Sequence, residues 1–174
     1  MSEIVQQSPT LSDILRRQLE KSIAMLYDII NECPDDSWSA DDGIAPIWQQ
    51  AYHSIYSLNA WVRDLSKAFD EPPFHTSGAQ AMVKSATPII TREQMLGYLK
   101  KVHADCNSFV DDLTLQSLTQ EEEVYGKMWT PADRIIGQIR HVQHHVGAMH
   151  STLRRHANMS LRWIGLVDWQ LGQA

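Results

Sequence analysis

The residues of this sequence with the clearest capacity for chemistry are its histidines, eight in 174 residues, four of them between positions 141 and 150. At about 100° per residue, His141 and His145 differ by only about 40° around a helix, so both imidazoles can reach one ion. His144 lies about 100° from His145, and we expect it to point into solvent. An H-x-x-x-H pair of this kind is compatible with a divalent-metal site, but taken alone it is more often a pair of surface or capping histidines.

The apolar stripe of the same segment predicts where the pair lies relative to the core. The stripe consists of Ile135, Ile139, Val142, Val146, Met149 and Leu153. It places His141 and His145 at the border between core and solvent, where a metal site with an open coordination position must lie. His150 is on the opposite border, and we interpret it as structural. No glutamate follows the first histidine of the pair, which excludes the zinc-protease motif H-E-x-x-H.

A metal that keeps an open position usually takes three protein ligands, so the third must come from another helix. The candidates are His53, His75, His103 and a carboxylate. His53 lies away from the apolar stripe of its own helix. Its side of that helix also carries Gln49, Gln50, Ser57 and Asp64. Helical-wheel geometry alone favours a solvent-facing His53 and leaves the third ligand open.

Four segments carry helical periodicity, and we predict no strand. The predicted helices span residues 11–32, 46–69, 91–115 and about 131–156. Thr10 or Ser12 caps the first, Thr91 and Gln94 form a capping box for the third, and Thr130-Pro131-Ala132-Asp133 starts the fourth. We therefore predict an all-α fold, a four-helix bundle formed by a single domain over residues 1–174 and followed by a short apolar C-terminal segment.

The segments between the predicted helices and the C-terminal tail are each interpreted from their composition. Residues 70–90 hold three prolines and one glycine, and we interpret them as a surface crossover, with a functional cover as the alternative. The charge run at 120–123 is interpreted as solvated surface. The tail must either fold onto the bundle or form a subunit interface, because it contains Leu161, Trp163, Ile164, Leu166, Val167 and Trp169.

Composition narrows the function classes. The net charge of −6 argues against nucleic acid as a partner. Cys33 and Cys106 make no disulfide framework, so we expect both to be reduced. No apolar run approaches the roughly 18 residues of a membrane span, and the N-terminus does not match a signal peptide. We expect no membrane association and a cytoplasmic protein.

Two segments resemble motifs of the DinB-like superfamily. Residues 47–56 (IWQQAYHSIY) are similar to its second-helix motif, and residues 139–147 (IRHVQHHVG) to its last-helix motif. The loop Glu71-Pro72-Pro73-Phe74 and the helix order also fit. The resemblance implies a pseudo-symmetric, antiparallel four-helix bundle in which His53, His141 and His145 hold a divalent metal. Some members are thiol-dependent transferases using bacillithiol, mycothiol or glutathione, and others are hydrolases or isomerases. Homodimers are common in the family, so we expect a homodimer here.

Three neutral imidazoles would leave the ion with its full charge and at least one open position. Such an ion lowers the pKa of bound water from about 15.7 to near 7, or holds a thiol as the thiolate. We therefore expect a small-molecule substrate, with zinc or nickel as the metal, iron or manganese as alternatives, and a low-molecular-weight thiol in the case of a transferase. Gln49, Tyr52, Tyr56 and Gln138 lie near the ligands in sequence and could orient substrate.

Two other functions remain open at this point. The first is a non-enzymatic, stress-related helical bundle that binds a partner, with the metal structural or absent. The second is a small-molecule binder with its pocket under residues 70–90. Fold alone does not choose among them.

Overall fold

Threonine residues begin three of the long helices, as the sequence predicts. In the computed structural model, which describes residues 8–40, 43–84 and 86–165, these N-caps are Thr10 for α1 (Leu11–Glu32), Thr91 for α4 (Arg92–Asp111) and Thr130 for α6 (Pro131–Ala157). Each threonine side chain accepts a hydrogen bond from the backbone N–H three residues later, and the side chain there bonds back to the threonine N–H. These capping boxes satisfy donors that a helix start leaves unpaired.

The remaining elements connect or complete these helices. They are α2 (Asp35–Trp38), α3 (Ile47–Trp61), the 3-10 turn η1 (Ala79–Ala81), α5 (Leu115–Leu118), β1 (Glu122–Val124) and β2 (Lys127–Trp129). Pro46 is the N-cap of α3, where its fixed φ suits a helix start.

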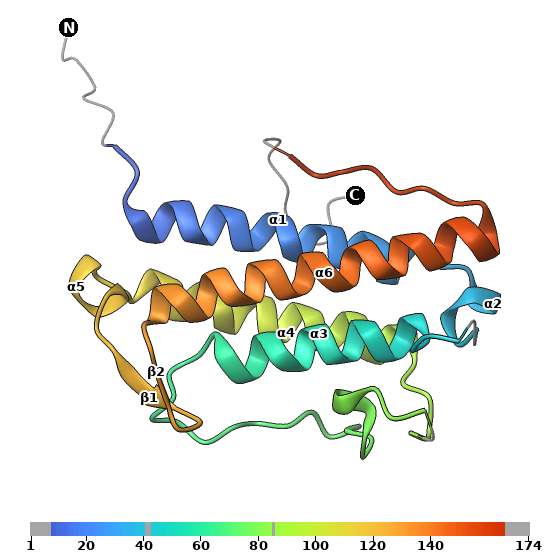
Figure 1. The fold of residues 1–174 in the computed structure, drawn as a ribbon, viewed down its shortest axis with the longest axis horizontal. Coiled ribbons are helices and arrows are strands. Elements are labelled where there is room, and N and C mark those ends of the chain that lie inside the picture. The colour runs from blue at the N-terminus through green and yellow to red at the C-terminus, as the bar shows by residue number, and fades with distance from the viewer. Residues whose placement is uncertain (1–7, 41–42, 85, 166–174) are drawn as a thin grey trace, which may run out of the picture.

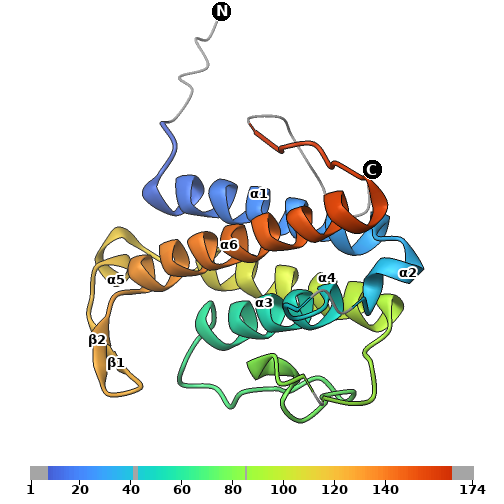
Figure 2. The ribbon, with the colours of Figure 1, turned by 45° about the vertical axis from the view of Figure 1, so that its right-hand side comes forward.

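Helices α1, α3, α4 and α6 form the predicted four-helix bundle (Figures 1 and 2). α1 packs against α4 and α6, and α3 packs against the same two helices from the other side. α1 and α6 run in one direction and α3 and α4 in the other (Figure 1). Since α3 and α4 are parallel, the chain between them must return along the bundle, and residues 62–91 make this crossover on the outer side of α3.

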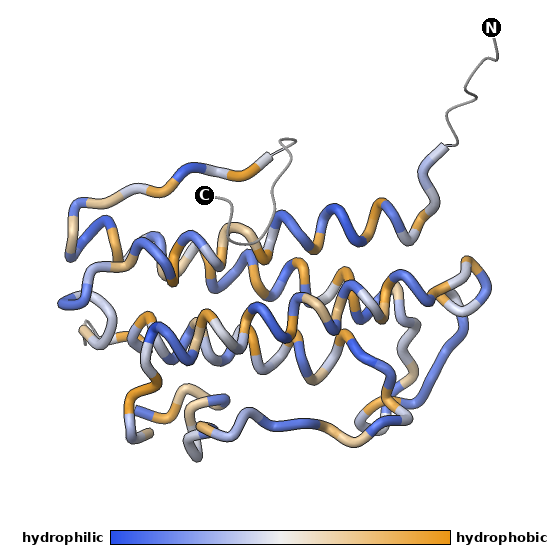
Figure 3. The backbone as a smooth tube through the Cα atoms, turned by 180° about the vertical axis from the view of Figure 1, so that it is seen from behind, coloured by the Kyte–Doolittle hydropathy of each residue, from blue (hydrophilic) through white to orange (hydrophobic). Residues whose placement is uncertain are grey.

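The core lies between the four helices, and hydrophobic and hydrophilic residues alternate in short runs along each of them (Figure 3). Its fully buried side chains include Leu19, Ile23, Leu26, Ile55, Leu58, Leu99, Val102, Ile135 and Val142. In the first turn of α1, the apolar residues Leu11 and Ile14 are 40% and 41% exposed. Within the described parts of the chain, no helix combines the length and the apolar character that crossing a membrane requires.

The helix that carries His53 ends earlier than predicted, at Trp61 instead of residue 69. The reason lies on α6, where the buried guanidinium of Arg134 donates to the backbone carbonyls of Trp61 and Arg63. Those acceptors are satisfied without a further helical turn. The chain is then free to leave the helix axis at Val62 and begin the crossover.

The third predicted helix also ends early, at Asp111 instead of residue 115. Thr114 interrupts it because the threonine side chain caps a new short helix, α5, by accepting from the N–H of Ser117. Local side-chain competition for backbone groups decides this boundary.

The expectation of no strand is wrong for residues 122–129. β1 and β2 form an antiparallel hairpin in which Glu122 pairs with Trp129 and Val124 with Lys127. Tyr125 and Gly126 occupy its turn with φ of 52° and 75°, the positive values that tight hairpin turns need. The charge run is not wholly solvated either, since the Glu122 carboxylate lies 3.3 Å from the Arg134 guanidinium.

The described part of the C-terminal segment lies against the bundle. Ile164 is buried and Met159 and Leu161 pack against the core, whereas Trp163 is 76% exposed. Leu166, Val167 and Trp169 fall outside the described residues.

Candidate metal centre

Three histidines from two helices meet on one side of the bundle. His53 lies in the middle of α3, and His141 and His145 lie one turn apart on α6, which packs against α3. Each of the three pairs of rings has its centroids 4.8 Å apart. One ligand nitrogen from each ring lies within 4.8 Å of the other two. The structure thus brings together the three residues that the family resemblance implied.

A hydrogen bond on the side of the ring that faces away from the other two histidines fixes the orientation of His53. Its Nδ1 lies 2.6 Å from the backbone carbonyl oxygen of Gln80, in η1. A carbonyl oxygen can only accept, so Nδ1 carries the proton and the Nε2 of the neutral ring carries a lone pair. That Nε2 lies 2.9 Å from the Nε2 of His141. His53 therefore presents its metal-binding atom to the α6 pair and turns its protonated atom away.

Both α6 histidines are neutral at physiological pH. Burial, assisted by the nearby rings of His53 and His144, lowers the pKa of His141 to about 4. The same causes, together with His141, lower the pKa of His145 to about 3. Neutral imidazole is the form that binds a metal ion. His144 is exposed, as its angular position predicted.

The donor set fits a divalent ion. Ligand nitrogens on a tetrahedral zinc ion stand roughly 3.3 Å apart, because each Zn–N bond is about 2.0–2.1 Å. The Nε2 atoms of His53 and His141 are 2.9 Å apart, which is below that value. All three ligand atoms lie within 4.8 Å of one another, which is above it. Three imidazoles and no carboxylate suit zinc, nickel or iron better than magnesium or calcium, which prefer oxygen ligands.

The other histidines considered as a third ligand lie elsewhere. His75 Nδ1 lies 2.6 Å from the hydroxyl oxygen of Tyr52. His103 Nε2 lies 3.1 Å from the side-chain nitrogen of Asn107, at the junction of α4 with α1. Neither belongs to the group that could share an ion.

The polar neighbours singled out from the sequence have mainly structural partners. Gln49 donates to the carbonyl of Val83, and the Tyr56 hydroxyl donates to the Glu71 carboxylate. Burial and that carboxylate raise the pKa of Tyr56 to about 12, so its proton is retained. Gln138 is buried on α6, and its amide oxygen has no partner among the described residues.

Sequence reasoning missed the group that orients His53, the Gln80 carbonyl. A backbone carbonyl has no residue signature, and only the length and the proline content of the crossover hinted at a covering role. The crossover covers the side of α3 that the helical wheel assigned to solvent, which is why His53 is half-buried.

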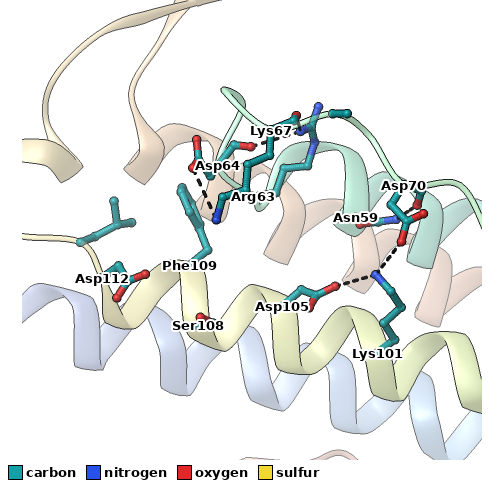
Figure 4. A pocket seen from close by; sticks show the side chains of 12 residues that line it. Asn59, Arg63, Asp64, Lys67, Asp70, Lys101, Asp105, Ser108, Phe109 and Asp112 are labelled. Atoms are coloured by element: carbon teal, nitrogen blue, oxygen red, sulfur yellow. Dashed lines mark hydrogen bonds and ion pairs between the residues drawn. The ribbon is translucent and has the colours of Figure 1, made fainter.

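A cavity of about 400 Å³ lies between the start of the crossover and α4, and its lining includes none of the three histidines (Figure 4). Lys101 bridges Asp70 and Asp105 across it at 3.3 and 2.9 Å (Figure 4). Lys101 and these two carboxylates are therefore paired with one another, and we assign no chemistry to the cavity.

Comparison with known proteins places the chain in a family. The model of the DinB superfamily matches residues 18–149, a span that contains all three histidines. The chain belongs to the DinB superfamily. No curated protein matches this DinB-superfamily chain. Among solved structures, the "conserved protein of locus from Enterococcus faecalis" is similar, with a TM-score of 0.62 and 14% identity over 84% of this chain and 97% of that one. At that identity the likeness concerns the fold alone.

Proposed function

We propose that this DinB-superfamily protein binds one divalent metal ion through His53, His141 and His145, and that the bound ion serves nucleophilic chemistry on a small electrophilic molecule. The observation that carries the proposal is the convergence of three imidazole nitrogens within 4.8 Å. Two of the three rings have lowered pKa values, and the third is held with Nε2 facing them. Zinc and nickel are the metals that we favour, with iron and manganese as alternatives.

The reaction class follows from the ligand set. A divalent ion held by neutral imidazoles keeps its full charge and, when bound, lowers the pKa of a water molecule or a thiol. The residues of the chain contribute by binding and orientation. His141 and His145 supply lone pairs because burial keeps them unprotonated, and the Gln80 carbonyl keeps the His53 proton on Nδ1. The proposed activity is transfer of a low-molecular-weight thiol to an electrophile, or hydrolysis.

Metal content of purified variants tests the binding part. Wild-type protein should carry about one divalent ion per chain after exposure to zinc or nickel. His53→Ala, His141→Ala and His145→Ala should each weaken zinc binding by more than the roughly 10–100-fold that loss of an outer-shell partner causes. The exposed His144 provides the matched control, and His144→Ala should retain the ion. Equal losses of zinc affinity in His144→Ala and His141→Ala would refute the assignment of His141 as a metal ligand.

The catalytic part needs a separate assay. Metal-loaded protein should accelerate the reaction of bacillithiol, mycothiol or glutathione with electrophilic substrates, or hydrolyse them, and His141→Ala should not. A protein that binds the ion but is inactive with every thiol and in hydrolysis would contradict the catalytic part. It would favour the alternative of a binding bundle with a structural metal.

A further inference from the structure

The crossover between α3 and α4 is hydrogen-bonded to α3 next to His53. We call residues 72–90 the strap. The side-chain amide of Gln49, one helical turn before His53, donates to the carbonyl of Val83 at 2.7 Å. The hydroxyl of Tyr52 lies 2.6 Å from Nδ1 of His75. Gln49 and Tyr52 are 1% and 0% exposed, so both bonds tie the strap to buried side chains of α3.

The part of the strap over His53 is a closed turn. The N–H of Val83 donates to the carbonyl of Gly78 at 3.0 Å. Gly78 has a φ of +83°, and a Cβ placed there would lie 3.1 Å from Cβ of Val83, so the turn suits glycine. Between these two residues the turn presents the Gln80 carbonyl to His53 at 2.6 Å. Gln49, by holding Val83, therefore holds the end of the turn that orients this carbonyl.

The hydrogen bond to its Nδ1 atom distinguishes His53 from the two α6 histidines. The Nδ1 atoms of His141 and His145 are buried and have no hydrogen-bonding partner among the described residues. No described protein group bonds these two rings at Nδ1. The strap does so for His53, and a second bond of this kind orients a metal-binding imidazole and raises its basicity.

We propose that the strap is a positioning element that keeps His53 protonated at Nδ1, with Nε2 directed at the α6 pair, and that Gln49 is the positioning residue that docks it. The proposal deepens the metal-binding function above and rests on it. Its effect on the protonated nitrogen of His53, however, exists in the metal-free protein as well.

The neighbour of Gln49 offers a matched control. Gln50 is also buried, at 3% exposed, and its amide also donates to a backbone carbonyl, that of Ala45 at 2.6 Å. That carbonyl precedes α3 and is not part of the strap. Gln49→Leu and Gln50→Leu thus remove the same kind of bond from adjacent positions, so a loss of stability alone should affect both.

The first readout is zinc affinity of the full chain, measured by competition with a chromophoric chelator. Gln49→Leu should bind zinc about 10–100-fold more weakly, whereas Gln50→Leu should stay within about twofold of the wild type. Equal affinities of the two variants would overturn the proposal. If Gln49→Leu does not fold, Tyr52→Phe removes only the hydroxyl that bonds His75 and should also weaken binding; an unchanged affinity there would equally overturn it.

The second readout uses the metal-free protein labelled with ¹⁵N in its histidines. Wild-type protein should show an Nδ1 proton, protected from solvent exchange, that His53→Ala removes and that exchanges faster in Gln49→Leu. A His53 ring protonated at Nε2, or an Nδ1 proton unaffected by Gln49→Leu, would refute the strap role. This measurement separates the two claims, because a wild-type protein that binds no metal would refute the proposed function while the NMR result still decides the role of the strap.

Discussion

The Nε2 atom of His53 lies 2.9 Å from the Nε2 atom of His141, although 88 positions separate the two residues in the chain. The approach depends on the packing of α3 against α6, which run in opposite directions (Figure 1). A pair of histidines one turn apart is a common surface pattern. The third imidazole from the neighbouring helix makes this pair a candidate metal centre.

Metal-free protein should lose stability as the pH falls from about 6.5 toward 4. In the folded protein the pKa of His141 is about 4 and that of His145 about 3, against an ordinary value of 6.5 for the unfolded chain. Between these values the unfolded chain binds more protons, so the free energy of unfolding decreases as the pH falls. Urea denaturation with chelator present, at a series of pH values, measures the slope.

The control for that slope is the double variant His141→Asn and His145→Asn, which should show a flatter dependence over the same range. His103 and His150, whose pKa values burial also lowers, keep their contribution in the variant. The hydrogen bonds to Thr130 lower the pKa of the capping carboxylate of Asp133, so it contributes toward the acid end of the range and does so equally in both proteins. An identical pH dependence of the free energy of unfolding in the two proteins would contradict the lowered pKa values of His141 and His145.

Arg134→Met should destabilise the fold by about 2–6 kcal/mol, since it leaves two carbonyls without this donor at about 1–3 kcal/mol each. The guanidinium bonds the carbonyls of Trp61 and Arg63 from a side chain that is 1% exposed. As a control, Arg16→Met removes an arginine that is 36% exposed and paired with Asp13 and Asp111. Such exposed pairs contribute at most about 1 kcal/mol. Thermal denaturation of both variants gives the comparison, and similar losses of stability would contradict the structural role of the buried Arg134.

Thr130→Ala should cost about 1 kcal/mol, the usual contribution of a helix N-cap. Its hydroxyl oxygen accepts from the N–H of Asp133 at 3.0 Å at the start of the helix that carries two of the three histidines. Thr130→Ser keeps the oxygen and should restore most of the stability. A serine variant as unstable as the alanine variant would indicate that the threonine methyl group, and not the cap, is responsible.

The sequence predicts the bundle because helix starts are local. Thr91 with Gln94, and Thr130 with Asp133, bond within three residues of each other, so their patterns are visible in the chain. The end of α3 was predicted wrongly because it depends on Arg134, 73 residues away from Trp61. No periodicity within residues 47–69 contains that information.

The candidate site also combines features that the sequence predicts with features that it could not predict. The shared direction of His141 and His145 and the exposure of His144 follow from helix geometry alone. The place of His53 does not, because a helical wheel places it on the polar side of α3 and cannot show that the strap covers that side. The family resemblance supplied His53, and the structure explains it through the Gln80 carbonyl.

The most direct test of the metal centre is a crystal structure of the zinc-loaded protein with anomalous diffraction data collected on both sides of the zinc absorption edge. We expect one anomalous peak per chain, about 2.0–2.1 Å from the Nε2 atoms of His53, His141 and His145. A peak bound to His144 or elsewhere, or no peak between these three rings, would contradict it.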